Sequence, residues 1–241
     1  MEIISVKNLK FTYDGQRTVL NGISFSVQEG EYTGIIGESG CGKSTLCHIL
    51  CGIIPNVYGG EISGHAVIDG RNLRDADFRE LAQTVGFVMQ DPDRQIVTST
   101  VEDELAFGPE NFCIPPEEIK RRVDDVINLL RMESFRYEDP NRLSGGQRHI
   151  VTIGSVLTLN PEIIILDEPY SSLDEENTER VRAALTEIRK TGKTVLIVEH
   201  DHSLIADADK WIVIDGGRIQ AEGTPAEIMS MHEPGSDKEH V

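Results

Sequence analysis

Apolar residues follow different spacings along the chain, and each spacing predicts a different kind of element. Near the N-terminus, apolar and polar residues alternate over residues 9–13 and again over 23–27, the period of a strand with one buried face. Asp-Gly pairs at 69–70 and 215–216 each follow an apolar segment, and such pairs favour tight hairpin turns. We therefore expect an N-terminal antiparallel sheet and two strand reversals.

Three short runs are rich in apolar residues but lack this alternation. They are YTGII at residues 32–36, IIIL at 163–166 and TVLIV at 194–198. Strands that are apolar on both faces are typical of a sheet that helices cover on both sides. Helical patterns separate these runs along the chain, as in βαβ units, so the pattern predicts an α/β core.

A helical pattern lies between the first and second of these strands. Pro115 and Pro116 begin a segment whose apolar residues share one helix face, namely Ile119, Val123, Val126, Ile127 and Leu130. Proline is favoured in the first turn of a helix, so we expect a helix here, within an inserted helical subdomain over about residues 91–160. We expect one domain over residues 1–231 and a polar, disordered tail at 232–241.

Composition restricts the class of protein. The 241 residues are 39% hydrophobic and 27% charged, which is ordinary for a globular protein, and no apolar run approaches the roughly 18 residues of a membrane-spanning helix. The N-terminus lacks the basic and apolar regions of a secretory signal, so we expect a cytosolic location. The net charge of -18 opposes binding to nucleic-acid phosphates, which Lys and Arg drive.

The four cysteines indicate neither a disulfide framework nor a metal site. Cys41, Cys47, Cys51 and Cys113 form no CxxC pair and accompany no histidine cluster, and the core is large enough to need no covalent staples. Cys47 and Cys51 would share one helix face, where small buried thiols are far more common than metal ligands. We therefore expect no zinc site.

A glycine-rich segment, GESGCGKST at residues 37–45, stands between a buried strand and a helical pattern. Such glycines let backbone N–H groups surround phosphate oxygens at a helix N-terminus. Lys43 would reach the β and γ phosphates, and Ser44 would offer its hydroxyl to Mg²⁺. The alternative is a glycine-rich turn without a ligand, which the flanking elements disfavour. The expected nucleotide contacts are Gly37, Glu38, Ser39, Gly40, Cys41, Gly42, Lys43, Ser44 and Thr45.

Two adjacent carboxylates end the second buried strand, in IIILDEP at residues 163–169. Ligands bind at the carboxyl ends of strands in open α/β sheets. Asp167 would help to hold Mg²⁺, and Glu168 would orient and deprotonate the water that attacks the γ-phosphorus. The alternative is an acidic loop without chemistry, which is less expected downstream of a phosphate loop.

A second anion-binding helix end is predicted at LSGGQ, residues 143–147. Ser144 is a natural N-cap, and Gly145 and Gly146 would leave backbone N–H groups exposed. A capped helix without a ligand is the alternative. Because one nucleotide need not fill both helix ends, two copies of the chain paired head to tail could share two nucleotides.

GESGCGKST, LSGGQ, IIILDEP, SSLD and VEHD occur in this order, and almost the whole chain resembles the nucleotide-binding subunit of an ABC transporter. The resemblance implies the fold class, a P-loop NTPase with an α/β, RecA-like core sheet, an N-terminal antiparallel β subdomain and an inserted helical subdomain. It also implies an ATPase that uses ATP and Mg²⁺.

The resemblance assigns roles to residues outside these carboxylates and glycines. It implies that Tyr13 stacks on adenine, that Gln90 senses Mg²⁺ and a membrane subunit, that Asp174 belongs to the D-loop and that His200 is a γ-phosphate switch. Taken alone, Tyr13 would more often be a strand aromatic and His200 a satisfied polar residue. Their positions relative to the phosphate loop and its neighbouring strands reverse that preference.

The resemblance groups the expected site residues by role. The catalytic residues would be Lys43, Glu168 and His200. The metal ligands would be Ser44, Gln90 and Asp167. The contacts to ATP on the opposite protomer would be Ser144, Gly145, Gly146 and Gln147. Glu199 and Asp201 flank His200 and are interpreted as tuning or solvated residues with no specific role.

One segment narrows the resemblance further. Residues 87–111, FVMQDPDRQIVTSTVEDELAFGPEN, are similar to the segment after the Q-loop in energy-coupling-factor and cobalt-type importers. That similarity implies a second ATPase subunit, either identical or paralogous, together with a transmembrane coupling subunit and a substrate-binding membrane subunit. It implies import of a vitamin or transition-metal ion and a peripheral position on the cytoplasmic face of the cell membrane, with no nucleic-acid partner.

The alternative is a soluble ABC ATPase that acts on nucleic acid or ribosomes. Only about 54 residues separate Gln90 from Ser144, which leaves no room for a long coiled-coil arm. The acidic charge also disfavours that class. Tyr170 and Cys41 occupy positions where many family members carry other residues, but neither departure removes a catalytic group.

Overall fold

The computed structural model describes residues 1–13, 17–171 and 173–232. Its strands are β1 (Glu2–Thr12), β2 (Thr18–Gln28), β3 (Tyr32–Ile36), β4 (Glu61–Ile68), β5 (Arg71–Asn72), β6 (Val85–Val88), β7 (Ile163–Asp167), β8 (Thr194–Val198), β9 (Lys210–Asp215) and β10 (Arg218–Gly223). Its α-helices are α1 (Lys43–Leu50), α2 (Ile53–Asn56), α3 (Phe78–Thr84), α4 (Val101–Asn111), α5 (Pro116–Leu130), α6 (Gly145–Leu157), α7 (Glu175–Lys190) and α8 (Pro225–His232).

A six-stranded sheet in the order β10-β9-β3-β8-β7-β6 forms the core. Neighbouring strands from β9 to β6 run parallel, and only β10 is antiparallel to its neighbour. The β3 and β8 strands cover the predicted ranges, and β7 extends the prediction by one residue to Asp167. Every residue of these three strands is buried, which explains why their sequences lack alternation. The predicted α/β class is confirmed.

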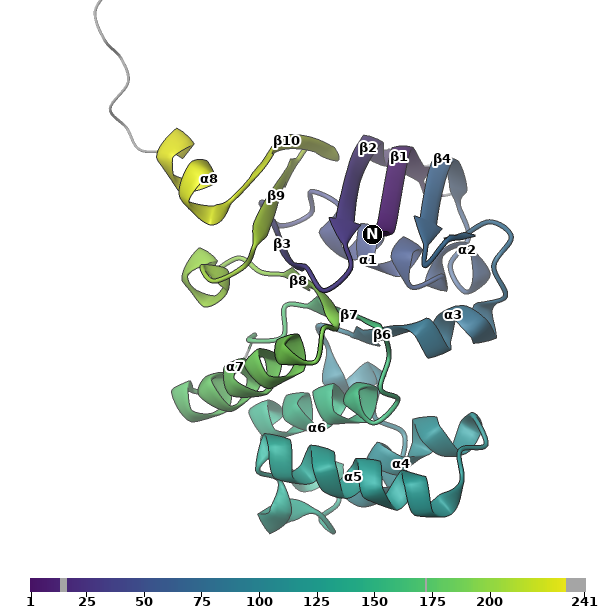
Figure 1. The fold of residues 1–241 in the computed structure, drawn as a ribbon, viewed down its shortest axis with the longest axis vertical. Helices are drawn as coiled ribbons and strands as arrows, with labels where there is room; N and C mark the ends of the chain where they lie inside the picture. The colour runs from purple at the N-terminus through teal and green to yellow at the C-terminus, as the bar shows by residue number, and fades with distance from the viewer. Residues whose placement is uncertain (14–16, 172, 233–241) are drawn as a thin grey trace, which may run out of the picture.

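The predicted N-terminal antiparallel sheet is present as β2-β1-β4-β5 (Figure 1). In β1 the buried positions change face between Val6 and Leu9, because the pairing with β2 shifts register there. Asn8, at this shift, has φ 49°, so a bulge moves the buried set to the other residue parity. The two predicted hairpins are also present, as β4–β5 and β9–β10.

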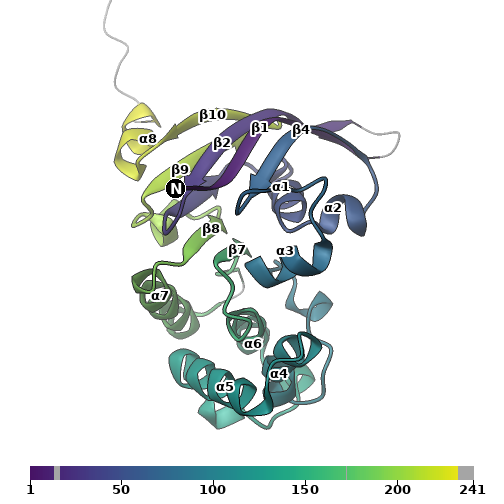
Figure 2. The same cartoon turned by 45° about the vertical axis from the view of Figure 1, so that its right-hand side comes forward.

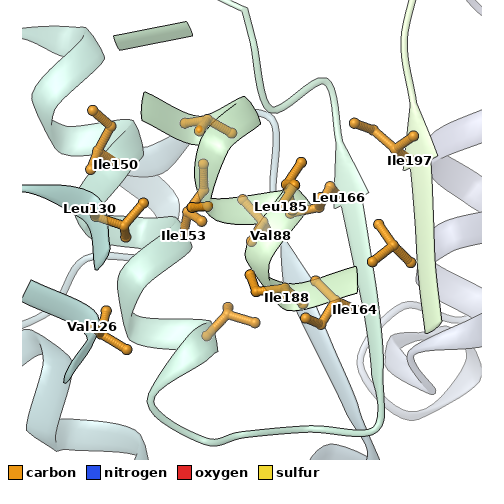
Figure 3. Packing of buried hydrophobic residues seen from close by; sticks show 14 of the residues in the cluster. Val88, Val126, Leu130, Ile150, Ile153, Ile164, Leu166, Leu185, Ile188 and Ile197 are labelled. Carbon is orange, nitrogen blue, oxygen red and sulfur yellow. The ribbon is translucent and has the colours of Figure 1, made fainter. Parts of the chain in front are cut away.

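Two hydrophobic clusters lie on opposite faces of the parallel sheet. One contains residues of α1, of the antiparallel sheet and of the parallel strands, so α1 lies between the two sheets (Figure 2). The other packs α6 and α7 against the opposite sheet face, and it includes Ile150, Ile153, Leu185 and Ile164 (Figure 3). The phosphate-loop helix is therefore fixed between two layers.

The α4, α5 and α6 helices occupy the predicted helical region, below the sheets in Figure 1. The α5 helix begins at Pro116, and the five residues predicted for its apolar face are all buried. Leu105 of α4 and Val126 of α5 both approach Gly154 of α6, and a Cβ there would lie within 3.3 Å of both side chains. Gly154 thus permits close helix packing.

The predicted tail begins at His232, which is the last residue of α8, and residues 233–241 lie outside the described residues. Among the helices that the structure describes, none combines the length and apolar character needed to cross a membrane.

Candidate functional site

The phosphate loop connects β3 to α1 and has a backbone that only glycine adopts readily. Gly37, Gly40 and Gly42 have φ values of 153°, 77° and 108°, all in the region that L-residues avoid. A Cβ on Gly37 would lie 2.0 Å from the carbonyl oxygen of Ile214. Gly42 is the N-cap of α1 and supplies no side-chain cap, so the first N–H groups of the helix stay available for an anion.

Lys43 is buried, and its ammonium is folded back onto the loop. Nζ donates hydrogen bonds to the carbonyl oxygens of Gly37 at 2.8 Å and Glu38 at 2.9 Å. The Cys41 sulfur lies 3.8 Å from the same nitrogen. The loop therefore holds a positive charge beside its own N–H groups, which suits a phosphate chain.

The remaining loop residues are arranged around this charge. Glu38, Ser39 and Gly40 are exposed, whereas Thr45 is buried. The Thr45 hydroxyl lies 3.2 Å from the Tyr13 hydroxyl, and the Tyr13 ring meets Phe11 edge to face with centroids 4.7 Å apart. Tyr13 is thus held beside the first turn of α1, and its role as the adenine-stacking residue stays a prediction.

Asp167 ends β7 and leaves one carboxylate oxygen without a partner. Its side chain is buried, and Oδ1 makes no hydrogen bond within the described chain. Burial raises the pKa of Asp167, whereas a hydrogen bond with Ser44 and the charge of Lys43 lower it. A buried oxygen without a partner is costly in a folded protein. The Ser44 hydroxyl and this oxygen together offer the hard oxygen ligands that Mg²⁺ prefers.

Glu168 contacts two residues that lie far from it in the sequence, Gln90 and His200. Its Oε1 lies 2.7 Å from His200 Nε2, and its Oε2 accepts a hydrogen bond from Gln90 Nε2 at 2.5 Å. Glu168 itself has φ 51°, a left-handed conformation that is rare for a residue with a Cβ and concentrates at functional sites. The sequence patterns contain no sign of this strain or of the Gln90 contact.

The LSGGQ turn forms a second helix N-terminus, as predicted. Ser144 Oγ accepts the Gln147 N–H at 3.2 Å, and Gln147 Oε1 accepts the Ser144 N–H at 3.0 Å, which is a capping box. Gly145 is exposed and a Cβ there would meet nothing within 4 Å, while Gly146 is buried. Within the described residues, no hydrogen bond joins this turn to the phosphate loop. One chain therefore has two separate helix N-termini at glycine-rich turns, and their binding of anions stays a prediction.

Asp174 caps α7, and among the described residues no hydrogen bond joins it to the phosphate loop. Its Oδ1 accepts the N–H of Asn177 at 2.8 Å, and its side chain is exposed. The structure thus shows a helix cap at this position. The D-loop role of Asp174 stays a prediction, because it depends on a second chain.

Two buried titratable residues near the site carry no role in the sequence analysis. Glu199 is only 5% exposed, so its interpretation as a solvated residue is wrong, whereas Asp201 is exposed as expected. Burial raises the pKa of Glu199 to about 7. His149 is also buried, which lowers its pKa to about 4. The one signal for Glu199 was its place directly after a fully buried strand.

An apolar groove lies beside Gln90. It has a volume of about 340 Å³ and lies between α3, the end of β6, α4 and the end of α6, and its lining includes Met89, Phe78 and Phe107. The two phenylalanines are 42% and 45% exposed. Gln95 ties the segment after Gln90 to the residues before it. Its side-chain NH₂ donates to the Phe87 carbonyl at 3.1 Å, and its side-chain oxygen accepts the Met89 N–H at 3.0 Å.

The fold and this site define a P-loop ATPase with an inserted helical subdomain. The chain belongs to the ABC transporter family, because the family model described as ABC transporter matches residues 20–171. It is accordingly an ATPase of the ABC type that binds ATP.

Curated relatives support this assignment at the level of sequence. The chain is 40% identical to the energy-coupling factor transporter ATP-binding protein EcfA1 of Lactococcus lactis, over 96% of this chain and 83% of that protein. It is 41% identical to a putative ABC transporter ATP-binding protein of Methanosarcina acetivorans over 90% of this chain. The chain spans about a third of the length of that relative, 34%.

Solved structures support it at the level of fold. CbiO1 from Clostridium perfringens, part of the ABC transporter complex CbiONQ, aligns with a TM-score of 0.83 and 31% identity, over 96% of this chain and 92% of that chain. A dimeric, post-hydrolysis structure of the ATP-binding cassette MJ0796 bound to ADP and Pi aligns with a TM-score of 0.81 and 27% identity, over 92% and 98%.

Proposed function

We propose that this chain powers the import of a micronutrient, a vitamin or a transition-metal ion, as the ATPase subunit of an energy-coupling-factor type transporter. One observation carries the proposal. We call the carboxyl ends of β6, β7 and β8, with the phosphate loop after β3, the catalytic edge. There Gln90 donates a hydrogen bond to Glu168, and residues on both sides of Gln90 line the exposed apolar groove. Chemistry at the nucleotide and contact with a membrane partner are thereby linked through one short segment. The similarity to EcfA1 and CbiO1 supports the type of transporter.

In this proposal the phosphate loop binds the triphosphate of ATP. The free N–H groups of α1 and the loop would surround phosphate oxygens, and Lys43 would exchange the carbonyls of Gly37 and Glu38 for the β and γ phosphates. Tyr13 would stack on the adenine. Glu168 would accept the proton of the attacking water, a contribution of roughly 10²–10⁴ in rate, while His200 would contact the γ-phosphate.

The residues at the end of β7 fit a magnesium ion. Asp167 Oδ1 is buried without a partner, and the Ser44 hydroxyl is adjacent to the same carboxylate. Ser44, Asp167 and Gln90 would hold Mg²⁺, which would neutralise charge on the β and γ phosphates.

Hydrolysis would take place between two ATPase chains. Ser144 Oγ accepts a hydrogen bond from Gln147, which leaves its own O–H free to donate to a phosphate. With the exposed Gly145 and its neighbours Gly146 and Gln147, it would contact ATP held by the phosphate loop of a second chain, identical or paralogous. Asp174 would lie at the same interface. The dimeric MJ0796 structure with ADP and Pi supports this arrangement, and closure of such a dimer around ATP would supply the power stroke.

The apolar groove would receive a short helix of a transmembrane coupling subunit. A groove with two half-exposed phenylalanines suits an amphipathic helix, and the chain would then lie peripherally on the cytoplasmic face of the membrane. A substrate-binding membrane subunit would contact the cargo. Dimer closure would move the groove through the Gln90 segment and so drive the membrane partner.

Phe107→Asp tests this function, with Tyr137→Asp as the matched control. Both residues are exposed aromatics of the helical region, but only Phe107 lines the groove. The tagged wild-type chain, purified from detergent-solubilised membranes of its source cells, should retain a small integral membrane protein. Burying a carboxylate against an apolar helix costs several kcal/mol, so Phe107→Asp should lose this partner and Tyr137→Asp should keep it.

Uptake of labelled vitamins and metal ions by the reconstituted complex identifies the cargo. Uptake that depends on ATP and is lost in Phe107→Asp supports the importer. Copurification of nucleic acid or ribosomes in place of a membrane protein, or equal recovery of the partner by both variants, contradicts it.

A further inference from the structure

A buried carboxylate lies behind the catalytic pair and accepts hydrogen bonds from two different loops. Glu199 follows β8 directly and is 5% exposed. Its Oε1 accepts the backbone N–H of Tyr170 at 3.1 Å, and its Oε2 accepts the backbone N–H of His200 at 3.2 Å. Its own N–H donates to the Ile35 carbonyl of β3 at 3.2 Å. Glu199 is therefore fixed to the sheet on one side and holds two loops on the other.

These two loops are the ones that carry Glu168 and His200. Tyr170 is two residues after Glu168, and His200 is the residue after Glu199. In front, Glu168 Oε1 and His200 Nε2 are 2.7 Å apart. The side chains of Glu168 and His200 and the carboxylate of Glu199 thus close a ring of contacts through the two backbones. A change at Glu199 would alter the spacing of the pair without touching the nucleotide.

The conformation of Glu168 gives Glu199 something to hold in place. The φ of Glu168 is 51°. A residue with a Cβ keeps this unfavourable conformation only where several surrounding bonds hold it there. The Glu168 N–H donates to the Val198 carbonyl at 3.0 Å, and the Ser171 N–H donates to the Glu168 carbonyl at 3.0 Å. The Tyr170 N–H adds a further bond to this turn, and its acceptor is the side chain of Glu199.

We propose that Glu199 is a positioning residue for ATP hydrolysis, whose carboxylate holds the Tyr170 and His200 backbones so that Glu168 and His200 keep the geometry for attack on the γ-phosphate. A neutral side chain could fill this buried place without the cost of desolvating a charge, so packing alone does not explain a glutamate here. The inference rests on the proposed roles of Glu168 and His200.

The ionisation of Glu199 is sensitive to its surroundings. Burial raises its pKa to about 7, while the N–H groups of Tyr170 and His200 lower it. Glu168 and Asp201 face it with negative charge and raise its pKa, and the buried Tyr32 and Tyr170 interact with it from β3 and from the turn. Both oxygens accept more strongly in the ionised carboxylate than in the protonated carboxyl group, in which one oxygen carries a hydrogen.

Glu199→Gln tests the proposal, with Asp201→Asn as the matched control. Both changes remove one negative charge next to His200, but Asp201 is exposed and caps Ser203. Glutamine presents an NH₂ group to one of the two N–H donors, so one bond is lost. Small displacements of this kind cost up to about 10²-fold in rate, so kcat for ATP should fall about 10- to 100-fold in Glu199→Gln. Asp201→Asn should stay within about twofold.

Three readouts separate positioning from loss of structure. The Kd of Glu199→Gln for a fluorescent ATP analogue should stay close to that of the wild type. The lost hydrogen bond should lower the free energy of unfolding, and the variant should stay folded at the assay temperature. Glu199→Asp keeps the charge but is one CH₂ shorter, and its kcat should lie between the two. In a Glu168→Gln background, Glu199→Gln should cause almost no further loss of rate, because it acts through Glu168.

The pH profile gives a further readout. As pH rises through about 7, Glu199 ionises, so kcat of the wild type should increase. The kcat of Glu199→Gln should not show this increase with pH. The effect on stability has the opposite sign. Because the pKa of Glu199 is raised in the folded chain, its contribution to the free energy of unfolding falls between its ordinary value of 4.5 and about 7.

Several outcomes overturn the inference. They are a kcat of Glu199→Gln above half the wild-type value, an equal fall in ATP affinity, and a loss that adds fully to that of Glu168→Gln. If Glu168→Gln alone leaves turnover near the wild-type rate, the proposed base is wrong. If Glu168→Gln abolishes turnover and Glu199→Gln does not, only the positioning role is wrong.

Discussion

Asp167 at the catalytic edge and Glu104 in the helical region are equally buried carboxylates, each 3% exposed, but their hydrogen bonding is opposite. Glu104 Oε2 accepts three hydrogen bonds, from the Val97 N–H at 3.0 Å and from the Thr98 N–H and hydroxyl at 2.9 Å each. Asp167 leaves Oδ1 without a partner among the described residues. Burial of a carboxylate is therefore no sign of function in itself. A buried carboxylate oxygen without a hydrogen-bond partner, as in Asp167, does indicate a place for a ligand.

The same contrast extends to the backbone of the two regions. At the catalytic edge, Glu168 and three glycines of the phosphate loop have positive φ. In the helical region, α4 and α6 both begin with a capping hydroxyl, from Thr100 and Ser144. The positive φ values of Cys113 and Arg131 lie just after the ends of α4 and α5, where such values are common. In the helical region the positive φ values thus terminate helices. The catalytic edge instead has strain at Glu168, N–H donors that phosphates of ATP would accept from, and a carboxylate oxygen that would bind Mg²⁺.

Glu168→Gln should have the largest effect and should act at the catalytic edge alone. The amide cannot take a proton from water, so steady-state ATP hydrolysis should fall roughly 10²- to 10⁴-fold. Binding of a fluorescent ATP analogue should be retained, because Glu168 is not a phosphate-loop residue. Turnover near the wild-type rate would contradict the role of Glu168 as the base. The catalytic edge would then not differ from the helical region in function.

Glu104→Gln should have the opposite profile. A neutral amide accepts weaker hydrogen bonds than a carboxylate, so urea denaturation should show a loss of about 1–3 kcal/mol in the free energy of unfolding. The kcat of the folded fraction of the isolated chain should stay within about twofold of the wild type, since the hydrogen bonds of Glu104 tie residues 97–98 to α4 and its other place is in the lining of the groove. A large loss of kcat at unchanged stability would show that this carboxylate also belongs to the catalytic machinery.

Local patterns predicted the elements of both regions well, because those elements depend on burial alone. The bounds of β3 and β8 and the buried face of α5 follow directly from residue type and spacing. The bulge at Asn8 and the positive φ of Glu168 could not be predicted, because each arises from contacts between strands far apart in sequence. Of the two interpretations of Glu199, the solvated one was wrong and the tuning one stays a prediction. Its acceptor role could not be predicted, because one of its two donors is Tyr170, 29 residues away.

Phosphate-loop motifs located the catalytic edge, but not the contacts within it. Lys43 and Ser44 lie where the glycine spacing placed them, at the start of α1. The bond of Gln90 to Glu168 spans 78 residues and joins two strand ends that only the sheet order β8-β7-β6 brings together. A motif can therefore indicate which residues act, whereas the order of the strands decides which of them meet.

Ser144→Ala should have the smallest effect on a single chain, and it tests whether a capped helix end can also be functional. Loss of the N-cap should lower the free energy of unfolding by about 0.5–2 kcal/mol. ATP affinity of the isolated chain should be unchanged, because no described hydrogen bond joins this turn to the phosphate loop. Loss of the hydroxyl should still weaken dimer formation with ATP in a Glu168→Gln background, measured by sedimentation velocity.

Gly145→Ala tests the same helix end without removing the cap. A Cβ at this position meets nothing within one chain, so any loss of ATP-dependent dimer formation would come from contact with a second chain. If both variants dimerise with ATP as the parent does, this helix end is a structural cap only, like that of α4.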